Sequence, residues 1–366
     1  MASFNFVGYL KPIKDTEKFK GFATTTYDSG WMTEKLRFNV IAGDNRHLVE
    51  VNAGRWQKEE KNMIYAFSKA SGTTKSQPIQ IPWSKRHDPD VIDNVAGWKL
   101  YTVDTDTFAN RKALEESGDT EAFAASQKKR KHFLAATEFC EYANKLVNSD
   151  KAKDWKFRVT GNINYVYSAK NGQYYATYEV NKIYRVADET EPMSEVTMDF
   201  YFAEDAMDRS DFADSGKATV SGYTMFYDNN TKRNWFCPVT LAVRDRVDGW
   251  EYTFNEFEND EVRKIGLILT KIDGAQKVDI TYDDLSDKVK ANIDRGMITL
   301  ERAIRDAGGQ AYGDRIQELR IADFGKGYTG GSETTIYTVE QLYLKPGDKV
   351  EDPDVDLFAT DDDDEL

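Results

Sequence analysis

The residues on either side of Asn171-Gly172 alternate between apolar and polar over a long stretch, from residue 155 to residue 186. An Asn-Gly pair is the strongest short-range signal for a β-hairpin, because both central residues of a type I′ turn need a positive φ. A two-residue loop here pairs Phe157 with Val186 and sorts the apolar side chains of both strands onto one face. A slip of one residue would reverse the sorting, so the sequence predicts a long antiparallel hairpin with one dry face.

Two more segments follow the same design. Residues 35–54 sort around an Asp44-Asn45 loop that pairs Leu36 with Ala53, and residues 263–282 sort around an Asp273-Gly274 loop. Hairpins that bury one face form small antiparallel sheets or barrels. If the alternation of residues 35–54 continues past residue 54, it also places Trp56 on the polar face.

Two segments, 119–147 and 283–307, space their apolar residues as helices do. Strand candidates outnumber them, and the helices do not alternate with the strands, which argues against a doubly wound parallel sheet. We therefore expect a mainly β chain, a β-rich α+β fold of tandem OB-fold-like antiparallel barrels or sheets with two inserted helices.

A length of 366 residues allows two or three domains, and the polar stretch Ser149–Asp154 has the composition of a linker. We expect an OB-like β module at 1–150 with a helical insertion at about 119–147, and a second OB-like β module at 151–247. A β module with a long helix at about 283–307 is expected at 248–350, followed by a disordered acidic tail at 351–366.

The end of the chain is strongly acidic. Residues 351–366 hold nine Asp or Glu side chains and no base, and they supply most of the net charge of −14. Such blocks repel themselves, stay disordered and often act as interaction tails. The apolar tip suits a docking peptide, although a solubility tail is the alternative. The residues expected to bind a partner are Phe358, Asp361, Asp362, Asp363, Asp364, Glu365 and Leu366.

Several classes of protein have no support in the sequence. It has no apolar run of about 18 residues, as a membrane span needs, and no apolar core near residue 1 of the kind a secretory signal has. The only cysteines are Cys140 and Cys237, too few for a disulfide scaffold, so we expect a cytoplasmic protein.

Enzyme motifs are also missing or incomplete. Residues 325–330 match G-x-G-x-x-G, but a strand-like segment follows them where a dinucleotide site needs a helix. No H-E-x-x-H, C-x-x-C or P-loop occurs, and the three His residues are isolated. We expect no catalytic residue, no cofactor and no metal site, with a nuclease built on scattered carboxylates as the alternative.

The polar faces carry rings and cations, which are what a module for single-stranded nucleic acid needs: platforms for bases and a basic track for phosphates. Core packing is the alternative for each tryptophan, and a solvated helix face is the alternative for the run Lys128–Lys131. The expected nucleic-acid-binding residues are Arg37, Trp56, Lys75, Trp83, Lys85, Arg86, Lys128, Lys129, Arg130, Lys131, Arg158, Tyr175 and Arg185.

With these faces, no catalytic motif and the closing run Asp361–Leu366, the chain resembles the single-stranded DNA-binding proteins of bacteriophages. The resemblance implies a non-catalytic, sequence-tolerant protein that protects replication or recombination intermediates. It also implies that the acidic tail competes with DNA and recruits replication or recombination proteins, with no membrane partner. A virion structural or assembly protein built of β modules is the alternative. The sequence leaves open which module binds the strand, whether the chain prefers DNA or RNA, and what its oligomeric state is.

Overall fold

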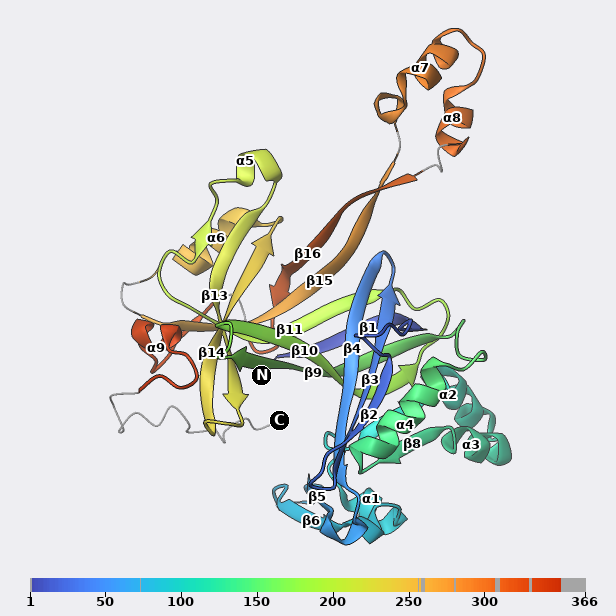
Figure 1. Ribbon diagram of the computed structural model, residues 1–366, viewed down its shortest axis with the longest axis vertical. Helices are drawn as coiled ribbons and strands as arrows, with labels where there is room; N and C mark the ends of the chain where they lie inside the picture. The colour runs from blue at the N-terminus through green and yellow to red at the C-terminus, as the bar shows by residue number, and fades with distance from the viewer. Residues whose placement is uncertain are drawn as a thin grey trace.

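The computed structural model describes residues 2–72, 74–255, 257, 261–279, 281–306, 310–328 and 331–349. The predicted acidic tail, with Phe358 and Asp361–Leu366, lies outside the described residues. The described chain forms two five-stranded barrels that pair with each other along one strand of each (Figure 1).

The first barrel is a closed circuit of β1 (Ser3–Pro12), β3 (Trp31–Ala42), β4 (Asn45–Trp56), β10 (Gln173–Arg185) and β9 (Lys156–Ser168). All neighbours are antiparallel except β4 and β10, which run parallel and meet at Glu50 and Glu179. In sequence, helix α4 (Ala136–Val147) lies between β4 and β9. Its apolar face packs on the barrel.

The second barrel repeats this circuit. Its strands, in order around the barrel, are β11 (Met193–Phe202), β13 (Ala218–Asp228), β14 (Arg233–Val243), β16 (Gln310–Phe324) and β15 (Arg263–Asp279). Again one neighbouring pair, β14 and β16, runs parallel, here at Ala242 and Arg320, and helix α6 (Val247–Asn255) lies between β14 and β15 in sequence. The predicted mainly β, OB-like class is confirmed.

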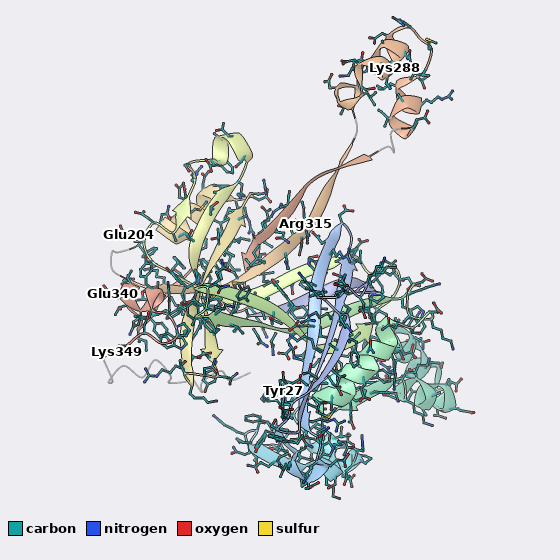
Figure 2. All side chains as sticks on the ribbon, in the orientation of Figure 1. Tyr27, Glu204, Lys288, Arg315, Glu340 and Lys349 are labelled. Atoms are coloured by element: carbon teal, nitrogen blue, oxygen red, sulfur yellow. The ribbon has the colours of Figure 1, made fainter. Side chains whose placement is uncertain are left out.

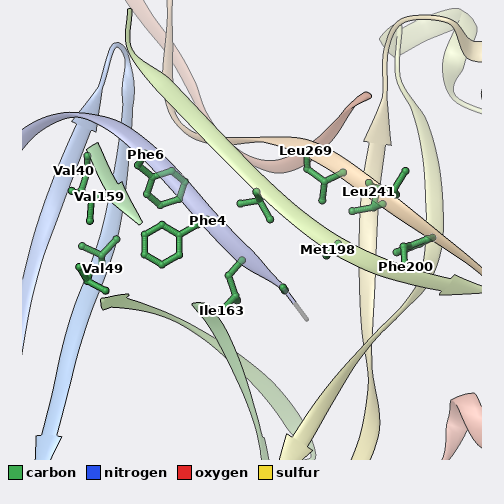
Figure 3. Close-up of a cluster of buried hydrophobic side chains, with 14 of the residues drawn as sticks. Phe4, Phe6, Val40, Val49, Val159, Ile163, Met198, Phe200, Leu241 and Leu269 are labelled. Atoms are coloured by element: carbon green, nitrogen blue, oxygen red, sulfur yellow. The ribbon is translucent and has the colours of Figure 1, made fainter. Parts of the chain in front are cut away.

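The barrels are joined through their first strands. Ser3–Val7 of β1 pairs antiparallel with Met193–Thr197 of β11, and one apolar core runs through both barrels. Figure 3 shows Phe4 and Phe6 of β1 inside this core, with Phe200, Leu241 and Leu269 of the second barrel further along it.

Shorter elements decorate the barrels. β2 (Phe22–Thr26) pairs with β3, and β7 (Tyr101–Asp104) and β8 (Arg130–Phe133) extend the first barrel beyond β10. The remaining strands are β5 (Met63–Phe67), β6 (Pro78–Pro82), β12 (Met207–Asp208) and β17 (Glu333–Thr334). The remaining helices are α1 (Pro89–Asn94), α2 (Phe108–Ser117), α3 (Thr120–Gln127), α5 (Phe212–Ser215), α7 (Asp287–Asp294), α8 (Leu300–Asp306) and α9 (Val339–Tyr343). Short 3-10 turns occur at Glu59–Lys61, Trp83–Lys85 and Tyr282–Asp284.

Helices α7 and α8 lie at the far end of the β15–β16 ribbon, away from the barrels (Figure 1). Among the described residues, no helix is both long and apolar enough to cross a membrane.

Two of the predicted hairpins are present with altered registers. In β3–β4 the turn lies at Gly43-Asp44, where Gly43 has φ of 61°, so Leu36 pairs with Val51 instead of Ala53. A shift of two residues leaves each side chain on its predicted face.

In β9–β10 the loop between the paired residues Ser168 and Gln173 holds four residues instead of two, so Ile163 pairs with Tyr178 instead of Val180. Further along, a β-bulge separates Val180 from Lys182. The bulge changes which residues face inward beyond it, so Ile183 is fully buried and Phe157 pairs with Arg185 instead of Val186.

The third predicted hairpin is wrong. β15 runs straight through Asp273-Gly274 and pairs with β16 along its length. Gly274 serves a close approach and not a turn, because a Cβ there would lie 2.1 Å from the carbonyl oxygen of Asp44.

Both predicted long helices are interrupted. The 119–147 segment divides into α3, β8 and α4, and the 283–307 segment divides into α7 and α8, with Thr299 capping the start of α8. The barrels also cross the expected boundaries, since the first has strands on both sides of residue 150 and the second has strands on both sides of residue 248.

A buried histidine sits where the two barrels meet. His47 of β4 is fully buried, stacks on Phe6 with ring centroids 4.1 Å apart, and places its Nε2 2.7 Å from the Ser194 hydroxyl of β11. Burial, with a smaller effect from the Lys271 charge, lowers the pKa of His47 to about 3. The ring is therefore neutral in the folded chain.

The buried neutral ring predicts a pH-dependent stability. Below pH 6.5 the unfolded chain takes up a proton at residue 47 that the folded chain does not, so the free energy of unfolding falls as the pH falls. His47→Gln removes this titration, and its loss of stability between pH 7.5 and pH 5 should be smaller by about 2 kcal/mol. Urea unfolding at each pH measures the difference, and equal declines in the two chains would contradict the buried neutral state.

Candidate nucleic-acid interface

The outward side chains of β3 and β4 form one continuous surface, which we call the β3–β4 face. Because side chains alternate along a strand, Leu36 and Phe38 point into the core while Lys35 and Arg37 point out. The face consists of Trp31, Lys35, Arg37, Arg46, Leu48, Glu50, Asn52 and Trp56, with buried Asn39 at its far end.

One end of the β3–β4 face is aromatic. Trp31 and Trp56 are cross-strand partners whose rings meet edge to face, with centroids 5.1 Å apart. With the half-exposed Tyr27 they line an open hollow of about 550 Å³, and Lys61 lies over the Trp56 ring. The Trp31 ring lies over Gly54, since a Cβ at residue 54 would be 2.4 Å from it.

The middle of the β3–β4 face is cationic. The Arg37 guanidinium lies 4.8 Å from the Phe19 ring centroid, and Arg37 and Lys35 both pair with Glu50 at 3.4 and 2.9 Å. Two cations therefore share the Glu50 carboxylate, and Glu179 of β10 lies opposite Glu50.

The other end of the face borders the second barrel. A hollow of about 510 Å³ is lined by Phe19, Leu48, Arg46 and by Arg315 of the β15–β16 ribbon, among others. Tyr27 and Arg315 mark the two ends of the β3–β4 hairpin in Figure 2. From Trp31 to Asn39 the face runs roughly 27 Å at the usual rise of a strand.

A second polar surface lies over β9 and β10 of the first barrel, next to the β3–β4 face. A groove of about 730 Å³ is lined by Arg158 of β9, Lys182 of β10 and the exposed Trp98 with Lys99. The ammonium of Lys99 lies 4.9 Å from the Trp98 ring centroid.

Carboxylates also line this groove. Glu179 and Glu195 are both in the wall. Burial first, and then the nearby Glu50, raise the pKa of Glu179, which accepts a hydrogen bond from Asn164. The carboxylates make the groove less positive than its three cations alone suggest.

Two of the predicted residues, Trp83 and Arg86, are held by packing, and the prediction for Trp83 needs correction. The Trp83 side chain is 9% exposed and packs in a small core with Ile64 and Ile81, so it offers no platform for a base. Arg86 covers that ring at 4.6 Å and bonds Glu138 at 2.8 Å. Lys85 pairs with Asp88 at 3.1 Å.

The run Lys128–Lys131 was predicted to lie on a helix. It instead spans the turn after α3 and the start of β8. Buried Asp104 accepts hydrogen bonds from Arg111 and from the Nε of Arg130 at 2.8–2.9 Å, and Lys129 reaches Asp106 at 3.2 Å. Burial raises the pKa of Asp104, but the bonds from the two arginines outweigh it and the pKa ends below its usual value.

Lys128 and Lys131 remain exposed, and the Lys131 ammonium lies over the ring of Tyr142. The four residues of the run therefore have two kinds of environment. Lys129 and Arg130 bind the buried carboxylates of Asp106 and Asp104, whereas Lys128 and Lys131 make no such bond to a buried carboxylate of the described chain.

The remaining predicted residues are spread over the molecule. Arg37 and Trp56 share the β3–β4 face, Arg158 lines the groove, and Tyr175 is exposed near the tip of β9–β10. Lys75 is exposed on a loop outside both surfaces. Arg185 packs over the Trp155 ring at 4.1 Å, because the bulge in β10 turns it away from the outer face.

Trp31 is the main site residue that the sequence reasoning missed. The predicted register left it without a cross-strand partner, whereas a turn at Gly43-Asp44 places it opposite Trp56. The signal was the glycine before the Asp-Asn pair.

Nucleophiles and metal ligands are not gathered at either surface. Burial raises the pKa of the Cys140 and Cys237 thiols to about 12, so both are protonated at neutral pH. Within the described ranges, no group of three or more His, Cys, Asp or Glu side chains is arranged to hold a metal ion.

No protein-family model and no curated protein matches the chain. Among solved structures it is similar to the wild-type single-stranded DNA binding protein from Thermus aquaticus and to a deletion mutant of that protein. Both likenesses have a TM-score of 0.31 and 10% sequence identity, and they cover 74% of this chain, with 85% of the wild-type chain and 87% of the mutant chain.

The different environments of Arg130 and Lys128 predict that alanine substitutions at these two positions change the free energy of unfolding by different amounts. Arg130→Ala removes a charged hydrogen bond from buried Asp104 and should lower the free energy of unfolding by about 1.5–3 kcal/mol. Lys128→Ala, the matched control in the same run, should change it by less than about 0.5 kcal/mol. Urea unfolding at neutral pH measures both. Equal, small effects would show that the network around Asp104 does not support the fold.

Proposed function

We propose that this chain binds single-stranded DNA along the β3–β4 face, without catalysis and with little dependence on base sequence. The observation that carries the proposal is the pair Trp31 and Trp56, two solvent-facing indoles at one end of a cationic barrel face. In five-stranded barrels of this kind the second and third strands form the usual surface for an oligonucleotide, and β3 and β4 are those strands here.

The chemistry of the face fits an extended single strand. Bases stack on tryptophan and tyrosine rings whatever their identity, because every base has a π-face. Arg37, Lys35 and Arg46 lie along the same strands and supply cations for the phosphates. A face of roughly 27 Å suits a short stretch of strand, within the about 4–16 nucleotides that such barrels contact.

Other exposed cations and rings extend the proposal. Arg158 in the groove, Tyr175 near the β9–β10 tip, and Lys75, Lys128 and Lys131 are all accessible to a strand that leaves the face. Trp98 and Lys99 beside Arg158 add a ring and a cation there. The Trp98 ring contacts Phe67 with centroids 5.0 Å apart, and we treat these contacts as secondary because Glu179 and Glu195 also line this groove.

The acidic tail belongs to the same proposal. Residues 351–366 carry nine acidic side chains and are part of the same chain as the DNA-binding face. This tethering gives the tail a high effective concentration at that face, where it would compete with DNA. We propose that the tail weakens DNA binding and that its apolar tip engages replication or recombination proteins in the cytoplasm.

Substitution of the two tryptophans tests the proposal. Trp31→Ala and Trp56→Ala should each weaken oligo-dT binding by about 1–3 kcal/mol, or roughly 5- to 150-fold, by removing a stacking platform. Tyr252→Ala is the matched control, since Tyr252 is an exposed ring on α6 of the second barrel. Fluorescence anisotropy with labelled oligo-dT measures the affinities. The same affinity in all chains, or no binding with and without residues 351–366, would refute the proposed function.

A further inference from the structure

The second barrel repeats the strand order of the first, and the face that corresponds to the β3–β4 face is covered. β13 and β14 are its second and third strands, as β3 and β4 are in the first barrel. Residues 332–344, which we call the C-terminal cover, lie across the outside of β13–β14, and Figure 1 shows α9 beside β14.

The cover meets the β13–β14 face ring against ring. The ring centroid of Tyr337 lies 5.1 Å from that of Phe236 on β14 and 5.8 Å from that of Tyr201, and Tyr343 lies 5.9 Å from Tyr223 on β13. These rings meet edge to face, with interplanar angles of 76–82°, and they cover the outer surface of β13–β14.

The cover is attached without being part of the barrel. The barrel circuit is complete at Phe324, where β16 ends. Two residue pairs join β17 to the start of β15, and the Thr335 amide donates to the Val262 carbonyl at 2.9 Å. Before the cover, four of the seven residues at 325–331 are glycine. Moving the cover therefore leaves all five strands of the second barrel paired.

Side-chain burial in the cover is uneven. Leu342 is 1% exposed and holds the cover to Phe236 and Val262, whereas Ile336 is 73% exposed. Leu342 is the one buried side chain of the cover, and partly buried Tyr337 and Val339, the two β17 pairs and the Thr335 hydrogen bond complete its attachment. Displacement of the cover is the kind of local opening that costs less than global unfolding.

Charge favours an exchange of the cover for DNA. The cover carries Glu333 and Glu340 and leads to the acidic residues 351–366, so a bound polyanion repels it. Arg263 at the rim donates to the Ser332 hydroxyl of the cover at 3.3 Å and also pairs with Glu261 at 3.3 Å, so opening would free one of its two polar contacts.

We propose that the C-terminal cover occupies a second strand-binding face, and that single-stranded DNA long enough to pass from the β3–β4 face to β13–β14 displaces it. The inference rests on the proposed function of the β3–β4 face. The cover would then make the length of DNA contacted by one chain depend on how much strand is available.

Amide hydrogen exchange on the full chain tests this, with a short oligo-dT that spans one face and a longer one that spans both. Both oligonucleotides should slow exchange in β3–β4, and only the longer one should speed exchange in residues 335–344. Slower exchange in β3–β4 with an unchanged cover at both lengths would overturn the inference and leave the proposed function standing. No change anywhere would overturn the proposed function, and the inference with it.

Two variants sharpen the test. Leu342→Ala removes the buried anchor, so exchange in residues 335–344 should be at least about tenfold faster without DNA, and shorter oligo-dT should open the cover. Ile336→Ala is the matched control in the same segment and should behave as the wild type. Unchanged exchange in the strands of both barrels confirms that the variants fold. An L342A chain whose cover responds to DNA no more readily than the control chain would contradict the proposal.

Discussion

Closure of five strands into a barrel is the constraint on which the rest of this structure depends. Once β1, β3, β4, β10 and β9 pair in a ring, every second side chain must face the core and the others must face out. Phe38 and Val49 fill the interior because of that alternation, and Arg37 and Trp56 reach solvent for the same reason. The candidate interface is thus a direct consequence of how the core is packed.

The chain contains two such barrels, and they differ in whether the face formed by their second and third strands in sequence is open or covered. The first barrel leaves its β3–β4 face open and lines it with Trp31, Arg37 and Arg46. The second barrel has the same strand order, but Phe236 and Tyr223 on its equivalent face lie under the aromatic side chains of residues 332–344. Pairing of β1 with β11 fixes the two barrels against each other, so the open face and the covered face belong to one continuous sheet.

Sequence patterns predicted the fold class and most outward side chains, because a period of two identifies the face of a strand whatever its exact partner. The two-residue error in β3–β4 was harmless to Arg37 and Trp56 for that reason, yet it hid the pairing of Trp31 with Trp56. Arg185 was misplaced because a bulge in β10 leaves no local signal. Gly274 was read as a turn, whereas its lack of a side chain serves contact with Asp44, more than two hundred residues away in the chain. Contacts of that range have no counterpart in local periodicity.

The central claim is that a single strand lies on the β3–β4 face, against the indoles of Trp31 and Trp56. Photocrosslinking tests it most directly, with oligonucleotides that carry a halogenated uracil and with the attached peptides identified by mass spectrometry. The account predicts that the crosslinks concentrate in the peptides that hold Trp31 and Trp56, and that excess unlabelled oligo-dT abolishes them. Crosslinks confined to other parts of the surface, with none in β3–β4, would contradict it.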